Sequence, residues 1–534
     1  MNTNALRQKI LDLAIHGKLV KQDPADESAA ILLEKIRAEK EKKIASGKLK
    51  RGKNDSYIFF GDDNRHYEKF ADGRIKDIED EIPFAVPEGW AWCRLPYLCK
   101  IPITDGTHQT PTYSNKENGI PFLSSKDVTS KKIDWSKIKY ITKELHEKLQ
   151  KRIKPCRNDI LLAKNGTTGI AALVDTDKIF DIYVTLALLR PVQVVHPNYL
   201  LYVINSPFCK KQFNSHLTGI GVPNLHLNDI CKTLIPFPPL AEQQRIVNMI
   251  EAIFSQIDVL EQNKADLQTT IEQTKRKILD LAIHGKLVPQ NPADEPASVM
   301  LERLRAEKEA KIAAGEMKRG KNDSYIYKNP TDNCYYQKYT DGGEENISDE
   351  IPFAVPDGWA WCRLPEVCRK PITDGTHNSP PNSASGAFLY ITAKNIKNLE
   401  ICLDDATYVS KEIHESIYSR CSPELNDVLL TKDGTIGEVA VNNLNYPFSM
   451  LSSVALIKPS KGILSWFLAY ILISDLLQNK MKKNAKGSAL KRIILTQIND
   501  FLIPLPPLAE QKRIVAKIEE LFAQLDFITT TLTK

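Results

Sequence analysis

The chain has 534 residues, of which 42% are hydrophobic and 26% charged, and its formal net charge at pH 7 is +6. This length exceeds one ordinary hydrophobic core, and the composition is that of a folded protein, so it excludes a mainly disordered chain. The mild positive charge permits nucleic-acid binding without requiring it. No apolar run is long enough to cross a bilayer, and the N-terminus lacks the apolar core of a signal peptide, so we expect a cytoplasmic protein.

The ten cysteines form no CxxC pair and are not grouped with histidines, which favours buried reduced thiols over metal ligands or disulfides. Lysine and arginine cluster at 48–53, 131–139 and 480–486. Such a run is more often a solvated face than a DNA contact.

The sequence contains one unit written twice. KILDLAIHGKLV at 9–20 recurs unchanged at 277–288, which sets an offset of 268 residues, and TDGTH at 104–108 recurs at 373–377. RGKNDSYI, IPFAVPxGWAWCRLP and PPLAEQxRIV recur in the same order. The offset places both chain ends over the central segment, so the repeat is circular and predicts pseudo-two-fold symmetry.

Seven segments follow from this repeat in chain order. They are the N-terminal part of a split helix at 1–20, a charged helical arm at 21–84, a globular domain at 85–236, a central long helix at 237–289, a second charged arm at 290–353, a second globular domain at 354–504 and the distal part of the split helix at 505–534.

The central segment predicts a long helix that begins after Pro239, carries Glu242 at its positive end and stops at Gly285. Its apolar residues alternate three and four apart, which is a coiled-coil heptad. Gly17 ends the split copy in the same way. The predicted helix-pair packing residues are Leu6, Ile10, Leu13, Ile246, Ile250, Ile253, Ile257, Leu260, Leu267, Ile271, Ile278, Leu281, Ile514, Ile518, Leu521, Leu525, Ile528 and Leu532.

Each globular domain contains an apolar strand, a glycine turn and a second strand, as in DILLAKNGTTGIAALV and DVLLTKDGTIGEVAVN, followed by helical sequence, so we expect α+β domains. The frames of the two copies are nearly identical, whereas the stretches at 109–163 and 378–431 differ heavily. A symmetric scaffold with unlike reading surfaces suits an asymmetric two-part DNA target.

Catalytic motifs are not found. GKLKRGKN and GEMKRGKN imitate a phosphate loop, but Asn54 and Asn322 stand where Ser or Thr would hold magnesium. The sequence shows no NPPY-type loop for a flipped adenine, no FxGxG loop for S-adenosylmethionine and no nuclease carboxylate cluster. We therefore predict no catalytic residues, no bound cofactor and no metal site in this chain.

With PPLAEQQRIV, PPLAEQKRIV, the GWAWCRL segments and the LAKNGTTG and LTKDGTIG turns, the chain resembles the DNA specificity (S) subunit of type I restriction–modification enzymes along essentially its whole length. The resemblance implies two target recognition domains separated by a pair of long antiparallel coiled-coil helices. It also implies double-stranded DNA, two methyltransferase (M) subunits and restriction/translocase (R) subunits as partners.

In such a complex, S-adenosylmethionine, ATP and magnesium would belong to the partner subunits. The holoenzyme would be a type I site-specific deoxyribonuclease and adenine-specific DNA methyltransferase. Two alternatives stay open at this point, namely a coiled-coil adaptor without DNA readout and a self-sufficient methyltransferase. For the charged arms, contact with the methyltransferase subunit or with flanking DNA and a solvated linker helix are equally acceptable interpretations.

DNA-binding candidates are polar residues that recur in turns of both copies, because shared residues suit shared work such as phosphate contact. Lys164 and Lys432 are the predicted phosphate contacts, whereas Asp105 and Asp374 fit turn formation better than DNA contact. The full candidate set is Thr104, Asp105, Thr107, His108, Lys126, Lys164, Asn165 and Thr167, with Thr373, Asp374, Thr376, His377, Lys394, Lys432, Asp433 and Thr435 in the second copy.

Overall fold

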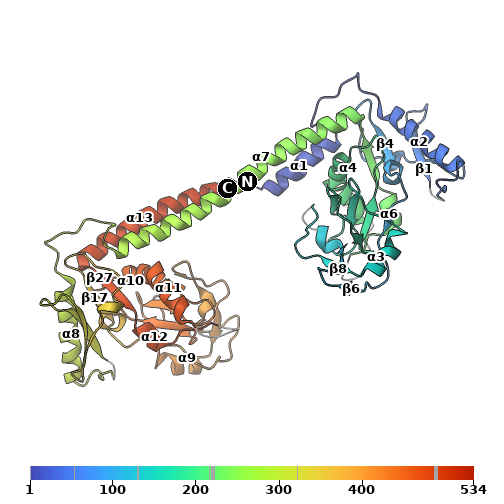
Figure 1. Cartoon of the computed structure of the whole chain (residues 1–534). Helices are drawn as coiled ribbons and strands as arrows, with labels where there is room; N and C mark the ends of the chain where they lie inside the picture. Colours follow the sequence, from blue (N-terminus) through green and yellow to red (C-terminus); the bar gives the residue numbers. More distant parts are fainter. Residues whose placement is uncertain are drawn as a thin grey trace. The chain divides into compact units, whose positions relative to one another are not determined.

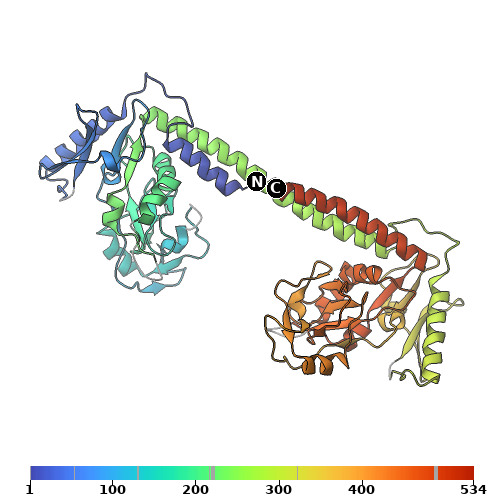
Figure 2. The same cartoon turned by 180° about the vertical axis from the view of Figure 1, so that it is seen from behind.

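The computed structural model describes residues 2–52, 55–128, 132–215, 217, 223–320, 323–485 and 491–533, with side chains up to 531. Lys53, Asn54, Lys131, Asn322, Lys486 and the side chain of Leu532, all part of the sequence predictions, lie outside the described residues. The chain forms two compact units, Met1–Asn263 and Lys264–Lys534, each with its own core (Figures 1 and 2).

Each unit holds an antiparallel helix pair (Figure 1). In the first unit, α1 (Thr3–Ile15) lies along the first part of α7 (Leu240–Ile283), and Arg7 contacts Asp258 at 2.7 Å. In the second unit, α13 (Leu508–Thr533) lies along the last part of α7, and Lys275 contacts Asp526 at 2.5 Å. These two ion pairs are related by the 268-residue offset, so the split helix predicted from the circular repeat is confirmed within each unit.

Glycine ends α1 and α7 as predicted. Gly17 has φ +65° and Gly285 has φ +64°, and the amides that follow donate to the carbonyls five residues back, Lys18 to Leu13 at 2.9 Å and Lys286 to Leu281 at 2.8 Å. This is the Schellman cap, which needs a residue in the left-handed region.

The helix-pair packing residues have different environments along the pair. Leu260 is 51% exposed, Leu267 38% and Ile528 41%, which departs from the predicted packing. They lie near the start of α1 or the end of α13, where the partner helix runs out. The fully buried members are Ile246, Ile250, Ile257, Ile271, Ile278, Ile514 and Ile518, and the half-buried members are Leu6, Ile10, Leu13, Ile253, Leu281, Leu521 and Leu525.

Both arms are folded, so the solvated-linker interpretation is wrong. In the first arm Leu32 and Ile36 of the helix enter the core of the recognition domain, and in the second arm Met300 and Leu301 do so. The sequence analysis identified only the helix of each arm. In the structure each of these helices is followed by a three-stranded antiparallel sheet. The elements are α2 (Ala29–Ala45), β1 (Ser56–Phe60), β2 (His66–Phe70) and β3 (Ile75–Asp77), and α8 (Ala297–Ala313), β14 (Ser324–Lys328), β15 (Tyr335–Tyr339) and β16 (Glu344–Asn346).

The first globular domain is α+β, as predicted. Its sheets have the orders β13-β4, β10-β9-β12-β5 and β11-β7-β8-β6. Its elements are β4 (Ala91–Arg94), β5 (Thr104–Asp105), β6 (Tyr113–Ser114), β7 (Ile120–Leu123), β8 (Lys139–Ile141), α3 (Lys143–Gln150), β9 (Ile160–Ala163), β10 (Ala171–Leu173), β11 (Asp181–Ile182), β12 (Leu186–Leu189), α4 (Pro197–Ile204), α5 (Pro207–Ser215), α6 (Leu227–Cys231) and β13 (Leu234–Phe237), with 3-10 turns η2 (Leu95–Leu98) and η3 (Ser125–Val128). The 3-10 turn η1 (Glu79–Glu81) belongs to the arm that precedes it.

The second globular domain repeats this plan with the orders β17-β27, β18-β26-β23-β24, β22-β19-β25 and β20-β21. Its elements are β17 (Ala360–Arg363), β18 (Thr373–Asp374), β19 (Phe388–Ile391), β20 (Ile396–Lys397), β21 (Glu400–Ile401), β22 (Thr407–Val409), α9 (Lys411–Tyr418), β23 (Val428–Thr431), β24 (Val439–Val441), β25 (Ser449–Met450), β26 (Val454–Ile457), α10 (Ser465–Ile473), α11 (Asp475–Asn484), α12 (Leu495–Asn499) and β27 (Leu502–Leu505), with η5 (Leu364–Val367) and η6 (Ala393–Asn395). The 3-10 turn η4 (Ser348–Glu350) belongs to the second arm.

The PPLAEQ motif joins the long helix to the arm and the domain. Glu242 accepts hydrogen bonds from Trp90 Nε1 at 2.9 Å and from Gln22 at 3.0 Å, and Glu510 accepts the equivalent pair from Trp359 and Gln290, both at 3.1 Å. Burial raises the pKa of both carboxyl groups, and the two hydrogen bonds oppose that effect. The motif is therefore a structural joint that appears once in each unit.

Candidate nucleic-acid interface

The TDGTH turn leaves the end of β5 in the first domain and of β18 in the second. A Cβ on Gly106 would lie 2.0 Å from the carbonyl oxygen of Ile182, and a Cβ on Gly375 would lie 1.9 Å from that of Met450. The next amide in each turn, that of Thr107 or Thr376, donates to the same carbonyl. Only glycine fits so close to another backbone, so the position of each turn is fixed.

Asp105 is the centre of a charge network in this turn. Its carboxylate is buried and contacts Lys164 Nζ at 2.6 Å, His108 Nε2 at 3.2 Å and Arg152 Nη2 at 3.2 Å. Burial favours a higher pKa for Asp105, but the hydrogen bonds and charges of Lys164 and His108 together outweigh burial and hold the pKa below its usual value. The side chain is therefore ionised and committed to its neighbours.

The second domain repeats the network. Asp374 contacts Arg420 at 2.8 Å, and Lys432 and His377 each at 3.3 Å. Lys432 also lies 3.7 Å from Asp433, which has no acidic counterpart in the first domain because Asn165 occupies that position.

Three separate loops meet around each network. The carbonyl oxygen of Thr185 accepts from the Lys164 amide at 2.9 Å, while its hydroxyl accepts from the Ser125 amide at 3.0 Å. Ser453 makes the equivalent bonds to Lys432 at 2.8 Å and to Ala393 at 3.1 Å. The turn that carries Lys126 or Lys394 is thereby tied to the loop that carries Lys164 or Lys432.

The glycine loop after β9 or β23 differs in charge between the domains. Asn165 forms a β-bridge with Asn224, whereas Asp433 pairs at the equivalent place with Arg492, 3.0 Å from Nε to carboxylate. Both members of the bridge differ between the two domains, two asparagines in the first and an aspartate with an arginine in the second. The backbone contact is therefore kept while the charges differ. Thr167 and Thr435 are exposed beyond these bridges.

The predicted site residues therefore divide by exposure. Lys164 and Lys432 are buried in ion pairs with Asp105 and Asp374, so their ammonium groups are not surface cations. Thr107 is buried, and Thr104, Thr373 and Thr376 are half-buried. The exposed candidates are His108, Lys126, Thr167, His377, Lys394 and Thr435.

Sequence reasoning missed Arg152 and Arg420. Each guanidinium bonds the network aspartate and the carbonyl of the TDGTH glycine, yet 49% and 54% of these side chains stay exposed. Both lie inside the divergent stretches. The sequence did contain a sign of them, because the 268-residue offset aligns Arg152 with Arg420.

The parts of the chain that the structure describes contain no group of three His, Cys, Asp or Glu side chains able to hold a metal ion. No described helix is both long enough and apolar enough to span a membrane.

A family model described as "Type I restriction modification DNA specificity domain" matches residues 87–269 and 356–534. The specificity subunits of the type I restriction enzymes EcoAI and EcoEI, both from Escherichia coli, are each 26% identical to this chain. The EcoAI alignment covers 97% of this chain and 88% of that protein, and the EcoEI alignment 99% and 90%. The arms, residues 21–84 and 290–353, both lie outside the matched ranges.

A chain from a solved structure concerned with complex assembly and conformational transition of the type I restriction–modification system has a TM-score of 0.55 at 21% identity. The alignment covers 84% of this chain and 94% of that one. At this identity the match shows a shared fold.

Proposed function

Because the chain belongs to the family of type I restriction–modification DNA specificity subunits, we propose that each of its two recognition domains reads one half of a bipartite double-stranded DNA target. The family assignment confirms the resemblance predicted from the sequence. It makes the chain the DNA target specificity subunit, a non-catalytic part of the complex, and removes the adaptor and self-sufficient methyltransferase alternatives.

The observation that carries the proposal is the difference between two equivalent loop clusters on one repeated frame. Both clusters have the same aspartate, lysine and arginine network, but Asn165 with Asn224 in one becomes Asp433 with Arg492 in the other. Groups shared by both domains suit phosphate contact, which carries no sequence information, and groups that differ suit base contact. We therefore propose that the two halves of the target are unequal.

Arg152 and Arg420 take over the phosphate-contact role first assigned to Lys164 and Lys432. A guanidinium has five N–H donors in a fixed plane, so one edge can bond the aspartate while the other bonds a phosphate oxygen. The exposed Lys126 and Lys394 add a second cation on the neighbouring turn of each domain.

The partners are proposed from the repeated joint. Each unit has its own PPLAEQ joint and its own helix pair, so the chain offers two equivalent places for two methyltransferase subunits. Restriction/translocase subunits would join for cleavage. S-adenosylmethionine, ATP and magnesium would act in these two kinds of partner subunit. The methyltransferase subunits would methylate adenine, and the restriction/translocase subunits would cut DNA.

The experiment is to co-express the chain with its methyltransferase partner and to sequence methylated adenines in the host genome. We expect one recurrent motif with two unlike specified halves and an unspecified spacer. A gel shift of the purified complex should then be specific for a duplex that carries this motif. Methylation without a bipartite motif would contradict the proposal.

A further inference from the structure

A groove lies between the first arm and the first recognition domain, with a cavity volume of about 1200 Å³. Its walls come from α2, the loop after it, β1–β3, η2 and the segment 100–103, with parts of α5, α6 and β13. All of these elements belong to the first unit. None of the candidate interface residues around the TDGTH turn lines this groove.

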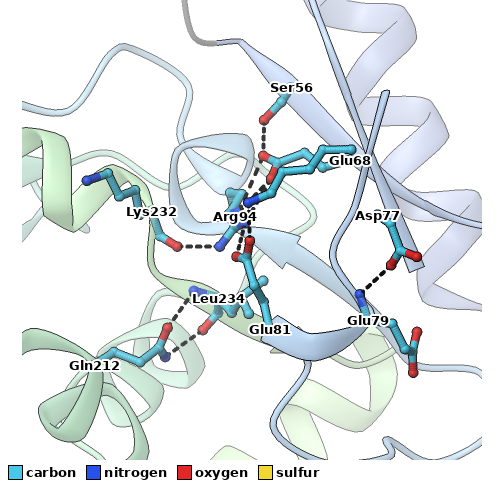
Figure 3. Close-up of polar contacts among 10 residues, drawn as sticks. Ser56, Glu68, Asp77, Glu79, Glu81, Arg94, Gln212, Lys232 and Leu234 are labelled. Atoms are coloured by element: carbon cyan, nitrogen blue, oxygen red, sulfur yellow. Dashed lines mark hydrogen bonds and ion pairs between the residues drawn. The ribbon is translucent and has the colours of Figure 1, made fainter. Parts of the chain in front are cut away.

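Arg94 fixes the arm against the domain at one wall of the groove (Figure 3). Its guanidinium bonds Glu68 of β2 at 2.8 Å, Glu81 of η1 at 2.7 Å and the carbonyl oxygen of Lys232 at 2.7 Å. The neighbouring Gln212 exchanges two hydrogen bonds with the backbone of Leu234 (Figure 3). Arg94 thus pairs with two of the four acidic side chains that line the groove, while Glu41 pairs with Arg51 and Asp55 accepts a hydrogen bond from the Gly52 amide.

Lysines without partners line the same groove. Within the part of the chain that the structure describes, the ammonium groups of Lys50 and Lys69 have no hydrogen bond or ion pair. Among the same described residues the ammonium group of Lys100 makes neither kind of contact, and its charge acts on Glu39 only at longer range. Arg37 lies over the ring of Tyr57, with 4.6 Å from its guanidinium carbon to the ring centroid, on another wall. The groove therefore presents unsatisfied positive charge.

The second unit is different at equivalent positions. Lys76 and Lys232, which line the groove, correspond to Glu345 and Asp500, while Glu68 changes in the opposite sense to Gln337. Lys100 corresponds to Arg369, which is paired with Asp427 at 2.8 Å. Lys50, Lys69 and Arg37 themselves recur as Lys318, Lys338 and Arg305, so the two units differ in the charges around these cations and not in the cations.

We propose that this groove binds the phosphate backbone of duplex DNA that flanks the half-site read by the first recognition domain. Residues 100–103 line the groove, and Thr104 opens the TDGTH turn directly after them. Four residues of extended chain span at most about 14 Å, so the groove and the interface lie within the reach of one duplex. This inference rests on the proposed function.

DNA fits the groove better than the other anionic occupants. The cavity is larger than the roughly 300–1,000 Å³ typical of small-molecule sites, and the free cations come from separate segments of the chain. The DNA backbone is a continuous polyanion, so it can contact several cations that are spread along a groove. Each phosphate that a cation neutralises releases counterions, and this gain does not depend on the base sequence.

The test compares Lys50→Ala with Lys69→Ala, combined in one chain, against the matched control Lys318→Ala with Lys338→Ala in the second unit. The complex with the methyltransferase partner is titrated with a duplex trimmed to the target and with one extended beyond the first half-site. For the extended duplex we expect roughly tenfold weaker binding and a log–log salt slope smaller by about 2. The trimmed duplex and the control should bind as the wild type does.

Equal weakening on the trimmed duplex, equal weakening in the control, or no weakening would overturn the inference. Loss of the methyltransferase subunit from the variant complex, with flank dependence intact, would overturn it in favour of a protein occupant. If the wild-type complex binds neither duplex specifically, the proposed function itself fails, so the two failures are distinguishable.

Discussion

The two recognition domains are built on one frame and differ in the loops around the TDGTH turns. The frame contacts repeat with the same geometry, as in Trp90 with Glu242 at 2.9 Å and Trp359 with Glu510 at 3.1 Å. The loop contacts change in charge, as in Asn165 against Asp433. The comparison teaches that a duplicated scaffold can keep its internal contacts while the loops that each copy carries diverge.

The largest expected effect comes from removing the centre of one network. Asp105→Ala would leave the buried Lys164 without its counter-charge, which costs about 3 kcal/mol. We expect denaturant unfolding of the first unit to shift and specific DNA binding to be lost. Asp374→Ala should do the same in the second unit. If Asp105→Ala leaves specific binding intact, the network does not position the loops.

This network also sets a pH dependence. Because the pKa of Asp105 is held below its usual value, its stabilisation is present above the ordinary carboxyl pKa and is lost as the pH falls through the lowered one. Asp105→Asn should flatten that acid limb of the stability curve. An unchanged limb would assign the acid sensitivity to other groups.

Gly106→Ala is expected to cost about 1–3 kcal/mol, because its Cβ would overlap the carbonyl of Ile182 and force the backbone apart. Gly375→Ala in the second domain provides the matched change. Thermal or denaturant unfolding measures both. A cost in one copy only would break the equivalence of the two turns.

Glu366 gives the second unit a pH response that the first lacks, since Tyr97 stands at its position. Burial raises the pKa of Glu366 to about 8, and the hydrogen bond from the Arg363 amide opposes this. A carboxyl group with a raised pKa in the folded state destabilises the fold as the pH rises, here between its ordinary pKa and about 8. Glu366→Gln should remove this slope in pH-dependent unfolding, and a slope that persists would exclude Glu366 as its source.

The smallest expected effect is that of the exposed arginines. Arg152→Ala should weaken DNA binding by about 1 kcal/mol for every target sequence and reduce the log–log salt slope by about 1. Arg420→Ala should match it through the other domain. Weakening that depends on the target sequence would show a base contact instead of a phosphate contact.

Much of the fold could be predicted because repeated sequence is a direct record of repeated structure. The helix ends at Gly17 and Gly285 followed from cap chemistry, and the split helix followed from the circular offset. The arm sheets were missed because charged and aromatic residues alternate there without an apolar core of their own. Their apolar face is completed by the recognition domain, a long-range contact that a local pattern does not contain.

The site was only partly predictable for a related reason. Repetition found the network residues, but it could not separate the buried Lys164 from the exposed Lys126, because exposure depends on which loops pack together. Arg152 was hidden in a divergent stretch, although the offset marked it. Leu260 and Leu267 fitted the heptad and are nevertheless exposed, since a heptad pattern does not say where the partner helix ends.

The most direct test of two independent readers is to exchange the divergent stretches. A chain in which 378–431 replaces 109–163, and which also carries Asn165→Asp and Asn224→Arg, should be co-expressed with the methyltransferase partner, and methylated adenines should be mapped by sequencing. We predict that one half of the methylated motif changes to match the other half, while the second half stays as it was. A change in both halves would contradict the account.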